Sequence, residues 1–179
     1  MPWHGHGPGS SAGNDGGGVY LEASQSQMSG CEITDNDTFN DGGGIACVVN
    51  STMQLADCMI NGNQITGGAS NAYGGGVYIY QSTVDISSCT IQDNTSPEFG
   101  GGVYTESSAV SVQETNICAN TPDQITGPYT HNGGNVIRTN CDYWVVDDLF
   151  DDESLAARRV AVETVYARLK SSLGLHWPD

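Results

Sequence analysis

The sequence predicts an all-β solenoid: a right-handed parallel β-helix with three strands per coil and about five coils, followed by a C-terminal α-helix. Three observations predict this fold class. A Gly-Gly-Gly-aliphatic motif recurs along the chain, a Cys-x-Ile-x-x-Asn motif keeps step with it, and apolar residues alternate with polar ones between the two. Fixed spacing within units, with insertions confined to loops, is typical of coils that stack only on their neighbours.

The glycine motif marks the start of each coil. Its four clear copies end in an aliphatic residue, at Val19, Ile45, Val77 and Val103. Glycine adopts positive φ without steric cost, so we expect the glycines at a corner and a first strand directly after them. A weaker copy ends at Val136, which we expect to open the first strand of a fifth coil, with Cys141 in the place of the serine found in earlier coils.

The cysteine motif predicts a third strand in each coil. It occurs at Cys31, Cys58 and Cys89, with Thr115 in place of a fourth cysteine. In stacked coils, its isoleucines would form an inward column and its asparagines a hydrogen-bonded ladder at a turn. These residues are Ile33, Ile60, Ile91 and Ile117, and Asn36, Asn63, Asn94 and Asn120. We expect the cysteines to be buried free thiols and the serines seven residues before them, Ser24, Ser51, Ser82 and Ser108, to be structural.

The repeats divide the chain into three parts. Residues 1–13 are expected to be a flexible N-terminal segment, residues 14–150 the β-helix, and residues 151–179 a C-terminal helix and tail. The apolar face of that helix would cap the last coil or dock onto a partner. Its candidate docking residues are Val162, Tyr166, Leu169, Leu173 and Trp177. An uncapped end of the β-helix would instead favour self-association or stacking of copies.

The chain is strongly acidic, and its charge is unevenly distributed. It has 21 Asp and Glu against 5 Lys and Arg, a formal net charge of −16, and no Lys or Arg before Arg138. This excludes a nucleic-acid binder that neutralises phosphates, and it disfavours docking on anionic membranes. No apolar run is long enough to span a membrane, and no signal peptide is visible.

The two motifs together, as in Gly17-Gly18-Val19-Tyr20 followed by the cysteine motif, resemble the repeats of bacterial right-handed β-helix proteins. These include the polymorphic outer membrane protein repeats and surface-anchored members of the pectin-lyase-like superfamily. The resemblance covers about residues 14–140 and implies the β-helix fold. It also implies a secreted or cell-surface setting, and it does not imply an enzyme.

The outward side of the first strands carries the candidate ligand-binding residues. Counting four residues back from each serine, or from Cys141, predicts an outward column of Tyr20, Cys47, Tyr78, Tyr104 and Ile137. Two residues further on stand Glu22, Val49, Tyr80 and Glu106. Aromatic rings with neighbouring carboxylates suit sugar rings or a protein partner. The alternative is that these tyrosines only pair along the sheet, since Tyr favours exposed strand positions.

Other candidate chemistry is sparse. Asp35, Asp37 and Asp41 lie in acidic turns that favour calcium but lack a complete ligand motif, so no cofactor is required and calcium is the one candidate. We assign no catalytic residue, because lyases of the similar fold need a basic residue that only Arg138 in the last coil supplies. Cys118 and Cys141 are the expected disulfide pair in an oxidising environment.

Three functions remain open from the sequence. The first is a non-catalytic cell-surface or scaffold module that presents a rigid Tyr- and Glu-bearing sheet to a glycan or protein partner, as in adhesion. The second is an accessory subunit that docks through its C-terminal helix into a larger assembly. The third is a polysaccharide lyase or glycoside hydrolase, which would need a groove with several carboxylates of raised pKa or a bound calcium ion.

Overall fold

The computed structural model describes residues 11–12, 15–67 and 72–141. The chain divides into two units, residues 1–141 and 142–179, and the described residues belong to the first. The helix expected within residues 151–179, with Val162, Tyr166, Leu169, Leu173 and Trp177, lies outside the described residues, as does most of the segment 1–13.

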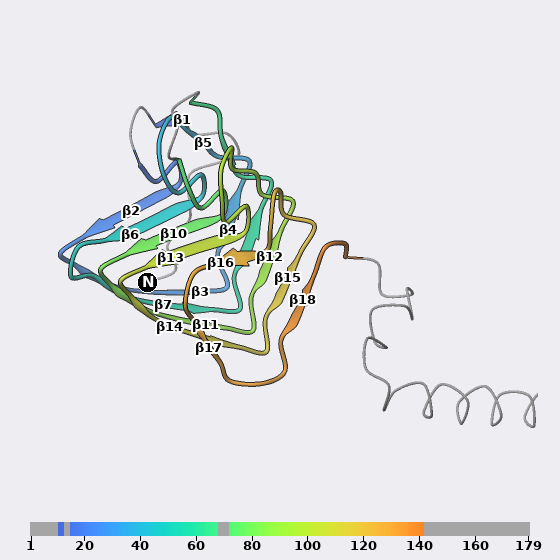
Figure 1. Ribbon diagram of the computed structural model, residues 1–179. Helices are drawn as coiled ribbons and strands as arrows, with labels where there is room; N and C mark the ends of the chain where they lie inside the picture. The colour runs from blue at the N-terminus through green and yellow to red at the C-terminus, as the bar shows by residue number, and fades with distance from the viewer. Residues whose placement is uncertain (1–10, 13–14, 68–71, 142–179) are drawn as a thin grey trace, which may run out of the picture. The chain divides into compact units, whose positions relative to one another are not determined.

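The described chain winds into coils whose strands all pair in parallel with the equivalent strands of neighbouring coils (Figure 1). Three main sheets result, each with five strands. The first sheet contains β2 (Val19–Glu22), β6 (Ile45–Val48), β10 (Val77–Tyr80), β13 (Val103–Glu106) and β16 (Ile125–Thr126). Four of these strands begin at the aliphatic residue that follows a glycine triplet, as the sequence predicts.

The other sheets complete each coil. The second sheet contains β3 (Gln25–Ser29), β7 (Thr52–Ala56), β11 (Thr83–Ser87), β14 (Ala109–Gln113) and β17 (Thr130–His131). The third contains β4 (Glu32–Thr34), β8 (Met59–Asn61), β12 (Thr90–Gln92), β15 (Asn116–Cys118) and β18 (Val136–Arg138). A smaller sheet at the corner before the glycines contains β1 (Ser11–Ala12), β5 (Asp37–Thr38) and β9 (Gln64–Ile65).

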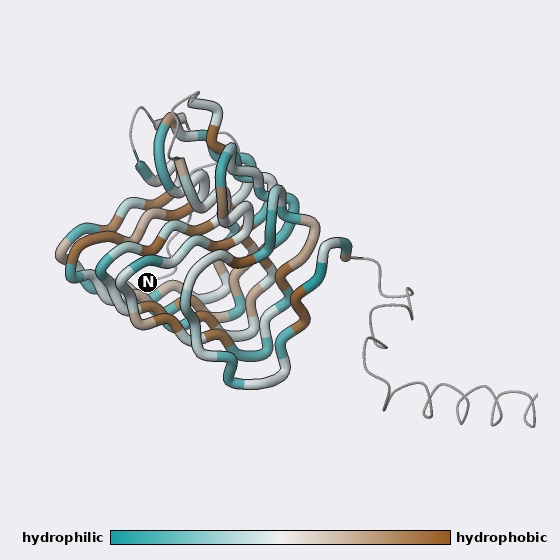
Figure 2. The backbone as a smooth tube through the Cα atoms, viewed as in Figure 1, coloured by the Kyte–Doolittle hydropathy of each residue, from teal (hydrophilic) through white to brown (hydrophobic). Residues whose placement is uncertain are grey.

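The core consists of columns of inward side chains, one residue per coil. Ile33, Ile60, Ile91 and Ile117 are aligned by the register of the third sheet and are buried, and Ile137 extends the column. Inward apolar residues alternate with outward polar residues along the strands, and Figure 2 shows this as hydrophobic and hydrophilic segments that succeed one another. Each fully buried Ile, Leu or Val side chain stabilises the fold by about 1.5–3 kcal/mol relative to an exposed one.

The glycine triplets are required by close backbone contacts at the corner. Gly42 has a φ of +70°, a conformation that residues with a Cβ rarely adopt. A Cβ at Gly43 would clash with the carbonyl oxygen of Gly75 in the next coil. Any larger residue would therefore push the coils apart at this corner.

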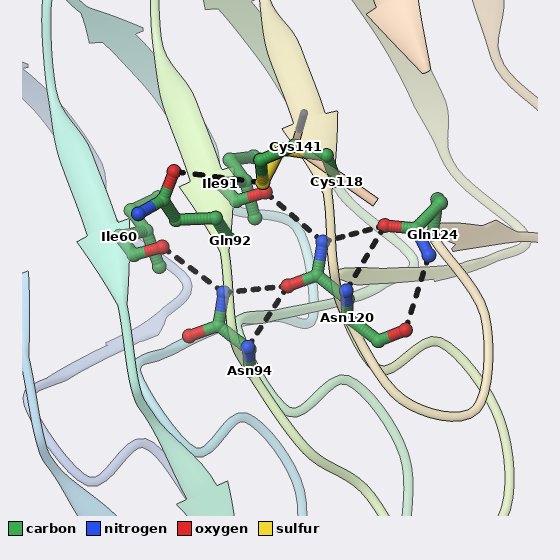
Figure 3. Close-up of a disulfide and its surroundings, with 8 residues drawn as sticks. All are labelled: Ile60, Ile91, Gln92, Asn94, Cys118, Asn120, Gln124 and Cys141. Carbon is green, nitrogen blue, oxygen red and sulfur yellow. Dashed lines mark hydrogen bonds between the residues drawn. A yellow bond between two sulfur atoms is a disulfide. The ribbon is translucent and has the colours of Figure 1, made fainter. Parts of the chain in front are cut away.

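The asparagine ladder forms as predicted and continues beyond the repeat. Asn94 Nδ2 donates to Asn120 Oδ1 (2.9 Å) and to the carbonyl oxygen of Ile60 (3.0 Å). At the last coil, Gln124 replaces asparagine, and its Oε1 accepts from Asn120 Nδ2 at 2.9 Å (Figure 3). The expected serine ladder also forms, since the backbone N–H of Ser51 donates to Ser82 Oγ.

The cysteines divide into two groups, as the sequence predicts. Cys31, Cys58 and Cys89 are buried and form no disulfide, and Cys47 is a fourth such cysteine. Cys118 and Cys141 form a disulfide on the outer side of the third sheet (Figure 3). It links the chain beyond β18 to the preceding coil.

The sequence count misplaces one residue in the second coil. Cys47 is buried in register with Leu21 and Ile79, so it faces the core, and Ala46 occupies the outward position between Tyr20 and Tyr78. Val48, not Val49, is aligned with Glu22. The extra residue of this coil lies in the turn after β6, where Val49 and Asn50 both have positive φ (45° and 57°).

The fifth coil also differs from the prediction. Its first strand is β16 at Ile125–Thr126, and Val136 and Ile137 belong to the third sheet. Gly133 and Gly134 therefore form the turn that precedes β18 and are not a copy of the first corner. Ile137 stacks on Ile117 in the core column and is not an outward residue of the first sheet.

Candidate ligand-binding face

The outward side of the first sheet brings the six predicted ligand-binding residues together. Tyr20 and Glu22 lie on β2, Tyr78 and Tyr80 on β10, and Tyr104 and Glu106 on β13. Their inward neighbours on these strands pack in the core, so alternation along each strand directs these six side chains outward.

Two further aromatic residues belong to this surface and were missed in the sequence. Tyr73 and Phe99 each precede the first glycine of a triplet, in the column that Asp15 and Asp41 occupy in the first two coils. Backbone hydrogen bonds from Gly42 to Tyr73 and from Gly74 to Phe99 define this column. Counting one residue back from each triplet would have identified both. We call these residues the aromatic face: Tyr20, Tyr73, Tyr78, Tyr80, Phe99 and Tyr104.

Five of the six rings form a continuous stack. The ring centroids are 6.2 Å apart for Tyr73 and Phe99, 4.5 Å for Tyr73 and Tyr104, and 5.8 Å for Tyr78 and Tyr104. Tyr80 continues it at 6.4 Å from Tyr78, and all four pairs have interplanar angles between 10° and 18°. A sheet of fixed register holds these rings, so the surface is preorganised for binding.

Two Tyr–Glu pairs stand in equivalent places on β2 and β13. The hydroxyl of Tyr20 donates to Glu22 Oε2 at 3.1 Å, and that of Tyr104 donates to Glu106 Oε2 at 3.4 Å. Partial burial, and then the neighbouring glutamate, raises the pKa of both tyrosines. Burial, followed by the charges of Asp41 and Glu106, also raises the pKa of Tyr78. All three hydroxyls therefore stay protonated and neutral at physiological pH.

Two aspartates border the stack at the corner of the first two coils. Asp15 Oδ1 accepts from the backbone N–H of Asp41 (3.3 Å), and Asp41 Oδ1 accepts from that of Tyr73 (2.7 Å). Burial raises the pKa of Asp41 to about 6, and the charge of Asp15 adds to this, although the Tyr73 hydrogen bond opposes it. Asp41 is thus a half-buried carboxylate beside the aromatic face.

The three aspartates expected to favour calcium do not form one site. Among the described residues, no group of three or more His, Cys, Asp or Glu side chains is placed to hold a metal ion. Asp35 lies exposed in the turn after β4, and Asp41 belongs to the corner described above. Asp37, on β5, accepts a hydrogen bond from Thr66 Oγ1. Calcium binding stays a prediction, and these three aspartates do not combine into one cluster that would support it.

Comparison with known proteins defines the class. The sequence model of a family described as "Right handed beta helix region" matches residues 9–143, well over half of the chain. The chain therefore belongs to the right-handed β-helix family, in agreement with its parallel sheets. No curated protein and no solved structure matches it. In the described part of the chain, no helix has the length and apolarity needed to cross a bilayer.

Proposed function

We propose that this chain is a non-catalytic β-helix module whose aromatic face binds a glycan or a protein partner. The observation that carries this proposal is one surface that holds a stack of five rings and two Tyr–Glu pairs. Large aromatic residues with hydrogen-bonding groups at their edges dominate binding at protein surfaces. Tyr20 and Phe99 remain 48% and 49% exposed, so part of this surface is available to a ligand.

The setting that we propose is extracellular or at the cell surface. The Cys118–Cys141 disulfide supports it, because disulfides form and persist mainly in oxidising compartments. Acid quenching of its native source, which stops thiol exchange, followed by alkylation in denaturant and mass spectrometry, tests this setting. Cys118 and Cys141 should escape alkylation, and two alkylated thiols at these positions would contradict the proposal.

Array binding with paired surface variants tests the binding function. The full chain would be applied to a glycan array and a peptide array, with and without calcium. Tyr20→Ser combined with Tyr104→Ser should weaken the strongest ligand at least about tenfold, because both Tyr–Glu pairs are lost. Met59→Ser combined with Gln54→Ser alters exposed residues of the other two sheets and should leave binding unchanged. Equal binding by all three proteins would exclude the aromatic face.

A second candidate function is glycoside hydrolysis, which the Asp15 and Asp41 pair favours. Such enzymes use two carboxyl groups, one of which has a raised pKa. Both carboxylates, however, accept backbone hydrogen bonds within the corner. Release of reducing ends from neutral and acidic polysaccharides, abolished by Asp41→Asn, would support an enzyme. If no reducing ends are released from any of these substrates, glycoside hydrolysis is excluded and the binding function stands as the proposal.

A further inference from the structure

The arrangement of the rings disfavours a sugar as the ligand of the aromatic face. Sugars bind best against the open face of an aromatic ring. Here Tyr104 lies in stacking contact with both Tyr73 and Tyr78, and Tyr73 also stacks on Phe99. The rings inside the stack therefore use their faces on one another and offer mainly edges and hydroxyl groups to a ligand.

The polar groups of the face are acceptors. In each Tyr–Glu pair the tyrosine hydroxyl donates its hydrogen bond to the glutamate. The phenolic oxygen and the second carboxylate oxygen can therefore accept hydrogen bonds from a ligand. Arginine and lysine side chains carry several donors and no acceptor, whereas sugar hydroxyls are both donors and acceptors. The two pairs thus match a cationic side chain better than a neutral sugar.

The charge around the face has no cationic counterpart. Asp15, Glu22, Asp41 and Glu106 border it, and the first 137 residues contain no Lys or Arg. Within the described residues the one arginine, Arg138, lies on β18 in the third sheet. A cationic ligand would relieve the repulsion among these carboxylates and would favour the ionised form of Asp41, which burial disfavours.

We infer that the aromatic face binds a basic polypeptide segment, in which two arginine or lysine side chains contact the Tyr20–Glu22 and Tyr104–Glu106 pairs. This inference rests on the proposed binding function and specifies its ligand. The pairs are three coils apart, since Glu22, Val48, Tyr80 and Glu106 are aligned in one column. At about 4.8 Å per coil they are separated by about 14 Å.

This separation predicts the spacing of the basic residues. An extended chain rises by about 3.4 Å per residue, so residues i and i+4 lie on one side about 14 Å apart. A peptide that lies along the solenoid axis would therefore place arginines at i and i+4 on the two pairs. Arginines at i and i+2 would be only about 7 Å apart and would reach one pair at a time.

Fluorescence anisotropy with defined peptides tests this inference on the full chain. The probe is a labelled peptide of serine and glycine with two arginines at i and i+4, in about 150 mM salt. Glu22→Gln combined with Glu106→Gln should weaken its binding at least about tenfold. The control, Glu32→Gln combined with Asp85→Asn, removes two exposed charges from the other sheets and should change binding less than about twofold.

Each alternative result has a distinct meaning. Equal weakening by the two double variants would show attraction to the bulk negative charge and would overturn the inference. Equal affinity for the i,i+4 and i,i+2 peptides would overturn the axial placement. A different result would be binding of a neutral oligosaccharide but not of the peptide, with the oligosaccharide binding lost in Tyr20→Ser combined with Tyr104→Ser. This would overturn the inference and leave the proposed function standing.

If neither probe binds, the inference and the proposed function both fail. Melting temperatures no lower than that of the unsubstituted protein would show that the variants are folded.

Discussion

At the scale of single residues, the buried amides of the asparagine ladder hold one corner of the solenoid together. Asn94 is fully buried, and its Oδ1 accepts from both the backbone N–H and the Nδ2 of Asn63 (each 2.9 Å). Its own Nδ2 donates to Asn120 and to Ile60. One side chain therefore satisfies polar groups of the coils on either side, where strand pairing is interrupted by the turn.

Replacing this amide should be severely destabilising. Asn94→Ala leaves the backbone N–H and Nδ2 of Asn63 and the carbonyl of Ile60 without these partners, so we expect a loss of about 3–4 kcal/mol in the free energy of unfolding. Urea denaturation followed by circular dichroism measures it. Gln124→Ala, at the end of the ladder, should cost about 1–2 kcal/mol. Equal losses at both positions would mean that the ladder does not couple the coils.

Asp41 makes stability depend on pH in the opposite sense to most carboxylates. Its pKa is raised from 3.8 to about 6, chiefly by burial. Between these values the folded protein binds more protons than the unfolded chain. The free energy of unfolding therefore falls as pH rises through about 4 to 6. Allowing for solvent screening of this half-buried group, the change is on the order of 1 kcal/mol.

An isosteric variant isolates this contribution. Asp41→Asn retains an oxygen that accepts from the Tyr73 N–H and removes the charge, so we expect it to stabilise the protein at pH 7 by on the order of 1 kcal/mol and to have little effect at pH 4. Denaturant titrations of both proteins from pH 4 to pH 7 provide the comparison. A difference that is constant with pH would contradict a raised pKa in the folded state.

At the scale of elements, the repeat identifies strands and core columns because one spacing recurs in every coil. The register of Ile33, Ile60, Ile91 and Ile117, the asparagine ladder and the strand starts after the glycines follow directly from it. The errors occur where the spacing changes. In the second coil the distance to Ser51 does not reveal whether the extra residue lies in the strand or in the turn, and the structure places it in the turn at Val49–Asn50.

The last coil shows a second limit of the repeat. The first strand returns at Ile125, only five residues after Asn120, without a glycine triplet. Gln124 makes this short path compatible with the ladder, because its longer side chain reaches the amide of Asn120 from a neighbouring turn. Asn135 likewise completes the cysteine column by accepting from the Thr115 N–H. Asn135 stands two residues before Ile137, the spacing that the cysteines keep in earlier coils, so the motif could have identified it. Gln124 has no spacing that the earlier coils define.

The glycine corner can be tested by comparing two alanine substitutions. A Cβ at Gly75 would lie 2.5 Å from the carbonyl carbon of Thr95, at the end of the same coil, and 2.6 Å from the oxygen of Gly101 in the next coil. Gly75→Ala should therefore cost more than about 3 kcal/mol or prevent folding. Gly30 has a positive φ but nothing within 4 Å, so Gly30→Ala should cost only about 1–2 kcal/mol.

Urea denaturation of the two glycine variants measures the difference. If Gly75→Ala fails to fold, its yield in the soluble fraction beside that of Gly30→Ala gives the same ranking. Similar small losses for both variants would mean that the coils separate easily at this corner and that the glycines serve only the backbone conformation.

At the scale of the whole molecule, the aromatic face illustrates why a ligand is harder to predict than a fold. Tyr20, Tyr78 and Tyr104 could be placed on one surface from their spacing alone. Their stacking with Tyr73 and Phe99 depends on side-chain conformations, which no sequence spacing determines. That stacking changes the surface from open rings to edges and acceptors, and with it the chemistry of the partner that fits.

The uneven charge of the chain predicts how salt affects its stability. The first 137 residues carry 13 acidic residues and no Lys or Arg, and coils about 4.8 Å apart hold these carboxylates close together. Their repulsion is weaker in the expanded unfolded chain, so it destabilises the folded state. Salt shortens the screening length from about 20 Å at 20 mM to about 4 Å at 0.5 M. We therefore expect the melting temperature to rise by about 5 °C between these concentrations of sodium chloride.

Differential scanning calorimetry at pH 7 measures this rise. The variant Glu32→Gln combined with Asp85→Asn, which removes two exposed charges, should show a smaller increase, because fewer repulsive pairs remain to be screened. The half-buried Asp41 is screened less than exposed carboxylates, so Asp41→Asn should leave most of the salt effect intact. A melting temperature that is constant or falls with salt would mean that the acidic residues are compensated within the folded chain.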